Sequence, residues 1–259
     1  MQNRTALITG SAKGLGRMTA LKLAEEGCNV VINYVNSRDE AAQLVEQLHA
    51  EGVRSAAVQA DISVQKDRLR LMEEAQSLVG PVDILVNNAG PFVRERRLFS
   101  EYTSAEINYL MQGNLLGVME LDLLLLQGMR QRQWGRIVHF GFGHAAEARG
   151  WPHRAVYAAA KVGLVSFTKT LAVEEAPHGI TVNMICPGDI RGANKEKLIS
   201  EVAQLQDDES PRGRPGAGED VARIICFLCQ PESDFVTGNI IDVNGGLDPI
   251  RSHIKKPLT

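Results

Sequence analysis

The chain has 259 residues, of which 44% are hydrophobic and 23% charged, and its formal net charge is −3. This composition supports a folded core and excludes disordered and fibrous proteins, while the weakly negative charge argues against nucleic-acid binding as the main activity. The four cysteines form no paired framework, which is typical of a reducing compartment. The longest apolar stretch, 115–126, is interrupted by Glu120 and Asp122, and residues 1–5 lack the apolar region of a signal peptide. We therefore expect a cytoplasmic protein that neither crosses a membrane nor binds nucleic acid.

Short apolar runs alternate with longer helical patterns from the start of the chain. Helices are expected at 15–26 and 37–51, each followed by a glycine, and Ser37 and Glu40 have the spacing of a capping box. This alternation predicts an α/β fold whose doubly wound parallel sheet is covered by helices on both faces. No linker divides the chain, so we expect a single αβα domain over 1–259. The runs expected to be strands are 6–8, 30–32, 56–58, 84–86, 137–138, 181–185 and 240–243.

One irregular span, 188–218, is charged and rich in glycine and proline. A linker is the plain interpretation of such a span. In a doubly wound fold, however, a long segment after the carboxyl end of a strand lies over the ligand crevice, which favours a mobile substrate lid. The tail 247–259 extends beyond the last expected strand, and we assign it no role.

A glycine-rich turn joins the first expected strand to the first expected helix and reads Thr9-Gly10-Ser11-Ala12-Lys13-Gly14-Leu15-Gly16. Gly10 permits a tight turn, and Gly14 and Gly16 let backbone amides approach a pyrophosphate at the positive end of the helix. Any tight connection of this kind favours glycine, so the turn alone is a weak signal. Its place after an apolar run and before an amphipathic one favours a dinucleotide site.

Two further motifs follow in order, Asn87-Asn88-Ala89-Gly90 after the fourth expected strand and Tyr157-Ala158-Ala159-Ala160-Lys161 later. Together with the glycine spacing they resemble the short-chain dehydrogenase/reductase family, and within it the 3-oxoacyl-[acyl-carrier-protein] reductase branch. The resemblance covers 5–246 and implies a Rossmann-type fold with a nicotinamide cofactor, whose adenine would lie at Asp61. The residues that the resemblance implies for the cofactor are Gly10, Ser11, Lys13, Gly14, Leu15, Gly16, Arg38, Asp61, Ile62, Asn88, Ala89, Gly90, Tyr157, Lys161, Pro187, Gly188 and Ile190.

The end of the second expected strand bears on which dinucleotide is bound. Residues 33–38 contain no carboxylate, and the first acid is Asp39. A carboxylate about 20 residues beyond the glycines would accept from the ribose 2′-hydroxyl of NAD and would repel a 2′-phosphate. Its absence, with Lys13 and Arg38 nearby, favours NADP(H) over NAD(H), although solvated surface charge is the ordinary interpretation of both side chains.

Tyr157 and Lys161 have the spacing that places two side chains on one face of a helix. A neighbouring ammonium and a nicotinamide cation are expected to lower the pKa of Tyr157, which would then exchange a proton with a substrate carbonyl as hydride is transferred. The resemblance implies that Lys161 also binds the nicotinamide ribose. It further implies that Asn114 helps to hold a relay water beside the lysine.

The serine that the family usually places after the fifth strand is missing, because 135–156 contains neither Ser nor Thr. Alignment from the strand puts Phe142 at that position, whereas counting back from Tyr157 puts His144 there. Either His144 supplies the hydrogen bond to the substrate carbonyl, or that donor is lost. Loss of one such donor costs about 100- to 1,000-fold in turnover in other enzymes.

We therefore expect an NADPH-dependent oxidoreductase that reduces a ketone to a secondary alcohol. The ketone would be a 3-oxoacyl thioester or another small carbonyl compound. Two other functions stay open: a nucleotide-binding protein with weak or no catalysis, because the serine is absent, and an NAD-dependent alcohol or sugar dehydrogenase.

Several features bear on partners. The apolar run 121–126, with the family's usual tetramer, predicts a homotetramer or homodimer, although a covered core helix explains the run almost as well. Val173 stands where carrier-dependent reductases of the family often have a basic residue. Cys226 and Cys229 fit a buried helix, so we expect no metal site. Clustered arginines would suit an acyl-carrier protein or a phosphorylated substrate, or are solvated charge: they are Arg94, Arg96, Arg97, Arg130, Arg132 and Arg136.

Overall fold

The computed structural model describes residues 1–93, 95–248 and 250. Its strands are β1 (Thr5–Ile8), β2 (Asn29–Tyr34), β3 (Ser55–Gln59), β4 (Ile84–Asn87), β5 (Gly135–Phe140), β6 (Ile180–Pro187) and β7 (Ile240–Val243). They form one parallel sheet in the order β3-β2-β1-β4-β5-β6-β7, so the chain winds outward from β1 in both directions. The doubly wound sheet is therefore confirmed, and every run expected to be a strand forms one.

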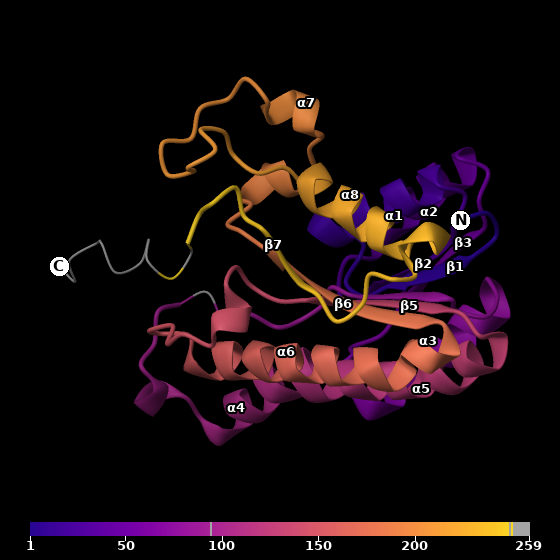
Figure 1. Cartoon of the computed structure of the whole chain (residues 1–259), viewed down its shortest axis with the longest axis horizontal. Coiled ribbons are helices and arrows are strands. Elements are labelled where there is room, and N and C mark those ends of the chain that lie inside the picture. The colour runs from indigo at the N-terminus through magenta and orange to yellow at the C-terminus, as the bar shows by residue number, and fades with distance from the viewer. Residues whose placement is uncertain (94, 249, 251–259) are drawn as a thin grey trace.

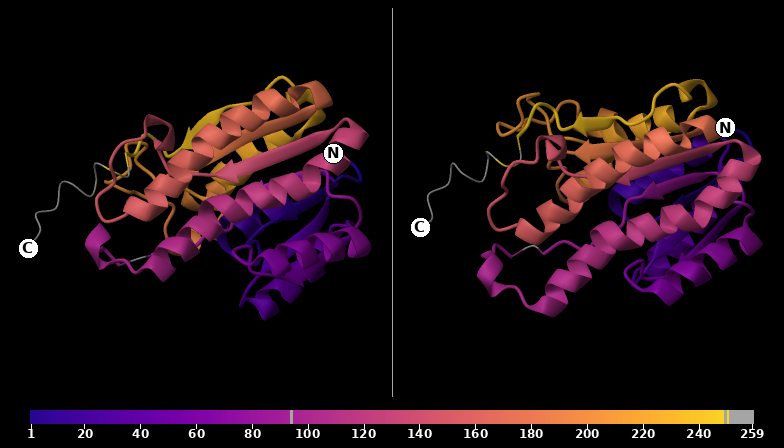
Figure 2. Two further views of the ribbon diagram at one scale, coloured as in Figure 1. Left: turned by 90° about the horizontal axis from the view of Figure 1, so that it is seen from below. Right: turned by 60° about the horizontal axis from the view of Figure 1, so that its bottom comes forward.

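Helices cover both faces of this sheet (Figure 1 and Figure 2). They are α1 (Gly14–Glu25), α2 (Arg38–Ala50), α3 (Gln65–Leu78), α4 (Ser104–Met111), α5 (Gly117–Arg132), α6 (Ala155–Glu175), α7 (Ile199–Val202) and α8 (Gly218–Cys229). Leu23 of α1 and Leu44 of α2 are fully buried against one face, together with α8. Leu71 of α3 and Leu121 of α5 are fully buried against the other. Covering on both faces explains why the strands are apolar on both sides.

The start of α2 differs from the prediction. Ser37 stands at the N-cap, but its side chain forms no cap hydrogen bond. Glu40 instead forms an ion pair with Lys13 of the glycine-rich turn. The predicted capping box is therefore wrong, because packing of α2 near α1 brings an opposite charge within reach of Glu40.

Two helical stretches of the described residues, Ser104–Arg132 and Ala155–His178, are long and apolar enough to cross a membrane by length and composition. Half of each apolar window is buried within the protein. Leu121 and Leu164 of these stretches are fully buried, as in the core helices of a globular fold. Asp122, one of the two acids within the apolar stretch 115–126, lies inside α5 and is buried with polar partners.

The carboxyl ends of the central strands meet at one edge of the sheet. Parallel pairing of β1 with β4, of β4 with β5 and of β5 with β6 makes these strands end side by side. The glycine-rich turn and the segments that begin at Asn88, Gly141 and Gly188 are therefore neighbours. The span 188–217 follows β6 and carries α7 away from the body of the sheet (Figure 1).

Candidate active site

Asn33, at the end of β2, holds the glycine-rich turn in place. Its side-chain oxygen accepts from the Gly10 N–H (3.1 Å), its backbone carbonyl accepts from the Ser11 N–H (2.9 Å), and its amide donates to the Ala60 carbonyl (2.9 Å). Asn33 is 1% exposed, so its side chain shapes the turn from inside the protein. Sequence reasoning missed this residue, and a polar side chain inside an apolar strand was the available signal.

The segment after β4 is fastened to the same turn. The side-chain amide of Asn88 donates to the carbonyls of Thr9 (2.9 Å) and Gly10 (3.0 Å), and the Ala89 N–H donates to Thr9 Oγ1 (2.9 Å). A Cβ on Gly16 would lie 2.7 Å from Asn88 Nδ2, closer than real carbon contacts allow. Only glycine therefore lets α1 begin this close to Asn88.

Tyr157 and Lys161 lie one turn apart on α6, with Lys161 Nζ 5.9 Å from the centre of the Tyr157 ring. Asn114 lies in a π-helical turn, Gln112–Leu116, which joins α4 to α5. Its amide donates to the carbonyl of Pro91 (2.8 Å), whereas its buried Oδ1 accepts no hydrogen bond from the described residues. Leaving a buried acceptor unsatisfied costs about 1–3 kcal/mol, and π-turns are frequent at functional sites.

The side chains of Asn114 and Lys161 converge at Gly90. A Cβ at this position would collide with Asn114 Oδ1 and would lie 3.5 Å from Lys161 Nζ. The unsatisfied oxygen and the ammonium therefore face the same stretch of backbone. The structure thus brings together the predicted catalytic residues of α6 and of the α4–α5 junction.

Burial governs the pKa of both α6 side chains. It lowers the pKa of Lys161 from 10.5 to about 8 and raises the pKa of Tyr157 above its ordinary 10.0. Removal from water disfavours the charged form of each group, which moves an amine and a phenol in opposite directions. In the protein without the nicotinamide cation that the prediction also invokes, the pKa of Tyr157 is raised, and the phenol is protonated at neutral pH.

A cavity of about 470 Å³ opens at this edge and is lined by Tyr157, Lys161 and Asn114. Its size falls in the range of small-molecule sites. Of the other residues predicted to bind a cofactor, those that line it are Leu15, Asn88, Gly90, Pro187, Gly188 and Ile190.

Phe142, and not His144, faces this cavity. The Phe142 ring is 5% exposed and its centre lies 6.1 Å from that of Tyr157. His144 adopts a left-handed backbone (φ +65°) and turns away, with Nδ1 2.8 Å from Glu147 Oε1 and Nε2 3.3 Å from Asn244 Nδ2. The structure does not bring the His144 imidazole to Tyr157, because the strand and not the spacing from Tyr157 sets the position of the loop.

The remaining predicted cofactor residues lie outside the cavity lining. The Asp61 carboxylate accepts from the backbone and hydroxyl of Ser63 (2.9 and 2.7 Å), and Ile62 is 3% exposed. Arg38 is exposed at the start of α2, and Lys13 has the Glu40 carboxylate as its partner. Lys13 is therefore partly neutralised before any ligand phosphate is considered.

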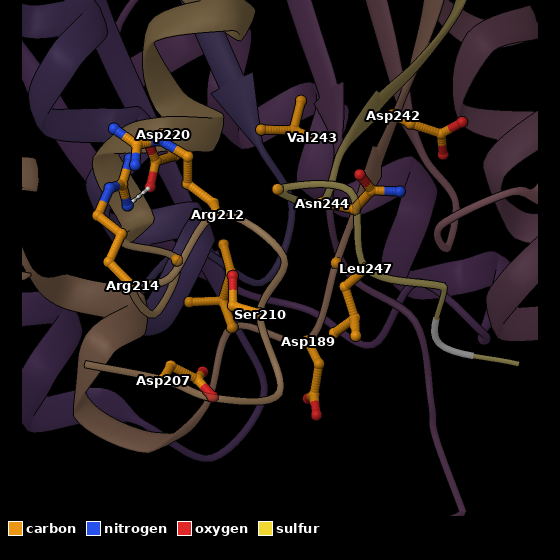
Figure 3. Close-up of a pocket in the computed structure, with 14 residues that line it drawn as sticks. Asp189, Asp207, Ser210, Arg212, Arg214, Asp220, Asp242, Val243, Asn244 and Leu247 are labelled. Carbon is orange, nitrogen blue, oxygen red and sulfur yellow. Dashed lines mark hydrogen bonds and ion pairs between the residues drawn. The ribbon is translucent and has the colours of Figure 1, made fainter. Parts of the chain in front are cut away.

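The span after β6 contacts the glycine-rich turn. The Gly14 N–H, at the start of α1, donates to Glu196 Oε1 (2.7 Å), and Arg17 lies 3.8 Å from the second oxygen of Glu196. A smaller cavity of about 170 Å³ lies between this span and the residues after β7, and Arg214 closes one side of it through its ion pair with Asp220 (2.8 Å; Figure 3). Gly188, Asp189 and Ile190 line both cavities.

Three of the clustered arginines lie at the opposite edge of the sheet, near the amino end of β5. Arg130 pairs with Glu175 (2.8 Å) and Arg132 with Asp83 (3.1 Å). Arg136 is 1% exposed. These three side chains therefore lie away from the site, and their positions give no support to a partner or phosphate bound beside it.

The other arginines follow β4. Arg94 lies outside the described residues, and Arg97 pairs with Glu106 (2.8 Å). Among the described residues, the arginine that lines the cavity is Arg154, three residues before Tyr157. Sequence reasoning did not single it out, although its position one turn before Tyr157 was visible.

A buried polar network lies under the site and was also missed. Asp122 of α5 lies 2.8 Å from His139 Nε2 of β5, and the other ring nitrogen lies 2.8 Å from Thr168 Oγ1 of α6. Asn87 donates to the second oxygen of Asp122 (2.9 Å). Asp122 and His139 are fully buried, so the pair ties α5 and α6 to the strands that carry the site. Polar residues within apolar runs were again the signal.

Comparison with known proteins defines the family. The family model described as enoyl-(acyl carrier protein) reductase matches residues 10–248. A 3-oxoacyl-[acyl-carrier-protein] reductase, FabG of Staphylococcus epidermidis, is 37% identical over 95% of this chain and 99% of its own. The chain belongs to the short-chain dehydrogenase/reductase family. The resemblance seen in the sequence is thus confirmed.

Other members of the family are similar over the same extent. YtkK of Bacillus subtilis is 44% identical over 96% of this chain and 98% of its own. A Bacillus thuringiensis structure described as a 3-oxoacyl-reductase is 45% identical, covers 96% of this chain and 99% of its own, and has a TM-score of 0.90. A gluconate 5-dehydrogenase of Burkholderia cenocepacia, in complex with NADP and tartrate, is 31% identical over 95% and 96%, with a TM-score of 0.81.

Proposed function

We propose that this short-chain dehydrogenase/reductase uses NADPH to reduce a ketone to a secondary alcohol. The observation that carries the proposal is the convergence of Tyr157, Lys161 and Asn114 on one cavity beside the glycine-rich turn. The similarity to a 3-oxoacyl-[acyl-carrier-protein] reductase supports the direction of the reaction.

The residues at this edge fit a nicotinamide dinucleotide. Gly16, where a Cβ would clash with Asn88 and the Gly10 carbonyl, lets α1 begin directly at the turn, and the buried Asn114 oxygen accepts no hydrogen bond from the described residues. The glycine-rich turn would hold the pyrophosphate, and Lys161 would hold the nicotinamide ribose. When bound, the nicotinamide supplies the hydride.

We propose NADP(H) rather than NAD(H). Residues 33–38 offer no carboxylate to a ribose 2′-hydroxyl, and Arg38 is exposed where a 2′-phosphate would lie. Because Lys13 is paired with Glu40, Arg38 is the cation that we assign to this phosphate. The relative that binds NADP supports the assignment.

Burial equips the chain's own residues for proton transfer to a carbonyl. A phenol whose pKa is raised is protonated at neutral pH, so Tyr157 hydrogen-bonds the ketone oxygen and donates its proton. Lys161, with its pKa near 8, then returns a proton toward Tyr157. A water between Lys161 and Asn114 Oδ1 would link this relay to solvent.

A second candidate function rests on Phe142. None of the described residues that line the cavity is a serine, threonine or histidine. A protein that binds the nucleotide and turns over slowly is therefore the alternative, because one donor to the carbonyl is missing.

For the substrate and the partners we propose a class of compound and an assembly, not a single molecule. We propose a small ketone, with an acyl-carrier thioester as one form, and a cytoplasmic homotetramer or homodimer. Carrier docking gains no support from Arg130, Arg132 or Arg136, which face the opposite edge. Val173, 76% exposed, is likewise uncharged.

Replacement of Tyr157 by phenylalanine tests the function. Loss of NADPH absorbance with a panel of ketones is expected in the native protein and should fall at least about 1,000-fold in Tyr157→Phe. Cofactor binding, measured by thermal shift with NADPH and NADH, should persist because the ring is retained. Equal turnover in both proteins would contradict the assignment of Tyr157, and no turnover in either, with NADPH still bound, would favour the binding protein.

A further inference from the structure

Aromatic rings form one wall of the cavity around Tyr157. The ring centre of Phe142 lies 4.7 Å from that of Trp151, and Trp151 lies 6.2 Å from Tyr157. Phe92 meets Tyr157 edge-on at 5.0 Å. Phe92, Phe142 and Trp151 all line the cavity, and they come from segments after β4 and after β5. Two separate parts of the chain thus supply ring faces beside one phenol.

The side chain of Arg154 places a positive charge at the same wall. The Arg154 guanidinium lies 4.9 Å over the Phe92 ring, and its Nη1 donates to the Glu95 carbonyl (2.7 Å). These contacts hold the charge in the cavity lining beside the rings. Arg154 is therefore placed to meet an anionic group of a bound molecule.

The other charges of the described lining lie toward the cofactor. Lys161 faces Gly90, and the Lys195 side chain lies 3.8 Å from where a Cβ on Gly14 would be. The acid of the lining, Asp189, pairs with Arg191 (2.6 Å). Of the described residues in the lining, Arg154 is thus the cation on the substrate side.

A wall of aromatic rings favours a flat aromatic substrate, whereas a polar wall favours a substrate that forms hydrogen bonds with it. Where the family usually presents a hydroxyl, the cavity lining has the small exposed part of the Phe142 ring and the Trp151 ring packed on it, so orientation of the substrate on this side depends on packing. Aromatic pairs contribute about 0.5–1.5 kcal/mol beyond the area they bury, and offset or edge-on geometry fixes the angle of a flat ring. A flexible acyl chain gains only the buried area.

On the basis of the function proposed above, we propose that the substrate is a flat aromatic ketone that carries an acidic group. Its ring packs against Phe142 and Trp151, and its acid lies at Arg154. The ketone is reduced and NADPH is oxidised: a hydride leaves a C–H bond of NADPH and forms a C–H bond at the carbonyl carbon, the C=O π bond breaks, and the oxygen takes the proton of the Tyr157 hydroxyl.

Matched ketones test the ring and the charge separately. The native enzyme with NADPH is assayed for kcat/KM with benzoylformate, with linear 2-oxohexanoate, with methyl benzoylformate and with acetoacetyl-CoA. We expect benzoylformate to exceed 2-oxohexanoate by roughly tenfold, which corresponds to about 1.4 kcal/mol. We expect a similar excess over the neutral methyl ester, because only the acid contacts Arg154.

Variants locate the two effects. Phe142→Leu keeps an apolar side chain without a ring face and should bring the ratio of benzoylformate to 2-oxohexanoate close to one. Phe235→Leu, at a ring 98% exposed, is the matched control and should leave the ratio unchanged. Arg154→Gln should raise KM for benzoylformate about tenfold, change KM for the methyl ester much less, and be rescued by Arg154→Lys.

The outcomes separate this inference from the proposed function. A native preference for 2-oxohexanoate or acetoacetyl-CoA overturns the inference while ketone reduction stands. If no ketone is reduced, quenching of Trp151 fluorescence by benzoylformate tests whether the aromatic wall binds this compound. Quenching that Phe142→Leu weakens and Trp151→Phe removes would support the aromatic site although the proposed reductase fails. Absence of quenching would overturn the inference as well.

Discussion

Lys161 carries an ammonium that is 3% exposed and pairs with no carboxylate among the described residues. Its pKa of about 8 shows that the folded protein disfavours the charge that the site requires. Asn114 also lowers stability, because its buried Oδ1 accepts no hydrogen bond from the described residues. At the scale of single residues the site is therefore built from groups that lower stability, which is common where function sets the side chain.

A lysine with a lower pKa in the folded than in the unfolded protein binds fewer protons when folded. The loss in free energy of unfolding caused by the buried ammonium is full below about pH 8 and disappears as the pH rises to 10.5. At about 1.4 kcal/mol per pKa unit, it is on the order of 3 kcal/mol at neutral pH. Lys161→Met should therefore raise the free energy of unfolding by about that amount at neutral pH, and progressively less above about pH 8, while turnover is lost.

Urea unfolding at neutral pH and at about pH 10 measures this change. Lys169→Met is the matched control on the same helix, because Lys169 is exposed, and it should shift stability little at either pH. A less stable Lys161→Met protein at neutral pH would show that the native ammonium has a stabilising partner.

At the scale of elements, the span after β6 and the start of α1 share one contact. The 3₁₀ turn Gly192–Glu196 places the Glu196 carboxylate on the Gly14 N–H, where the positive end of α1 attracts an anion. The pyrophosphate proposed above would meet the same positive end. Glu196 and the cofactor therefore compete for one region of charge.

Glu196→Gln should tighten NADP(H) binding roughly two- to fivefold, because a charge near a helix terminus contributes about 0.3–1 kcal/mol. Titration calorimetry with NADPH measures the dissociation constant. Glu201→Gln of α7 is the control, since its carboxylate accepts from the Leu198 N–H (2.7 Å) away from the turn. Weaker binding by Glu196→Gln would indicate that the carboxylate positions the turn for the cofactor.

At the scale of the whole molecule, apolar side chains remain uncovered on the helical layer that carries the site. Leu123 of α5 is 69% exposed and Val173 of α6 is 76% exposed. Leu116 and Leu124 are each 40% exposed beside Leu123 along the same helical path. Exposed apolar surface of this kind favours burial against a second copy of the chain.

Leu123→Asp should dissociate the proposed oligomer, because a buried carboxylate without a partner costs several kcal/mol. Light scattering after gel filtration should then report about the mass of one chain, 28.3 kDa, instead of a multiple of it. Leu78→Asp, at an apolar side chain 57% exposed on α3, should not change the mass. A native protein that already elutes as a single chain would contradict the proposed oligomer.

The amino-acid sequence by itself determined the architecture and the place of the main motifs. Strand-helix alternation is local, and the short connections after β1 and β4 fix where the glycine-rich turn and Asn88 lie. Tyr157 and Lys161 could be placed on one helical face because their spacing depends only on helix geometry. These features need no knowledge of distant contacts.

Only the tertiary structure decided which side chains act together and in what charge state. Phe142 rather than His144 faces Tyr157, because β5 sets the start of the loop and a left-handed turn directs the imidazole to Asn244. The partner of Lys13 and the pKa of Lys161 depend on elements far away in the sequence. Ion pairing and desolvation are set by neighbours in space, and sequence patterns report neighbours along the chain.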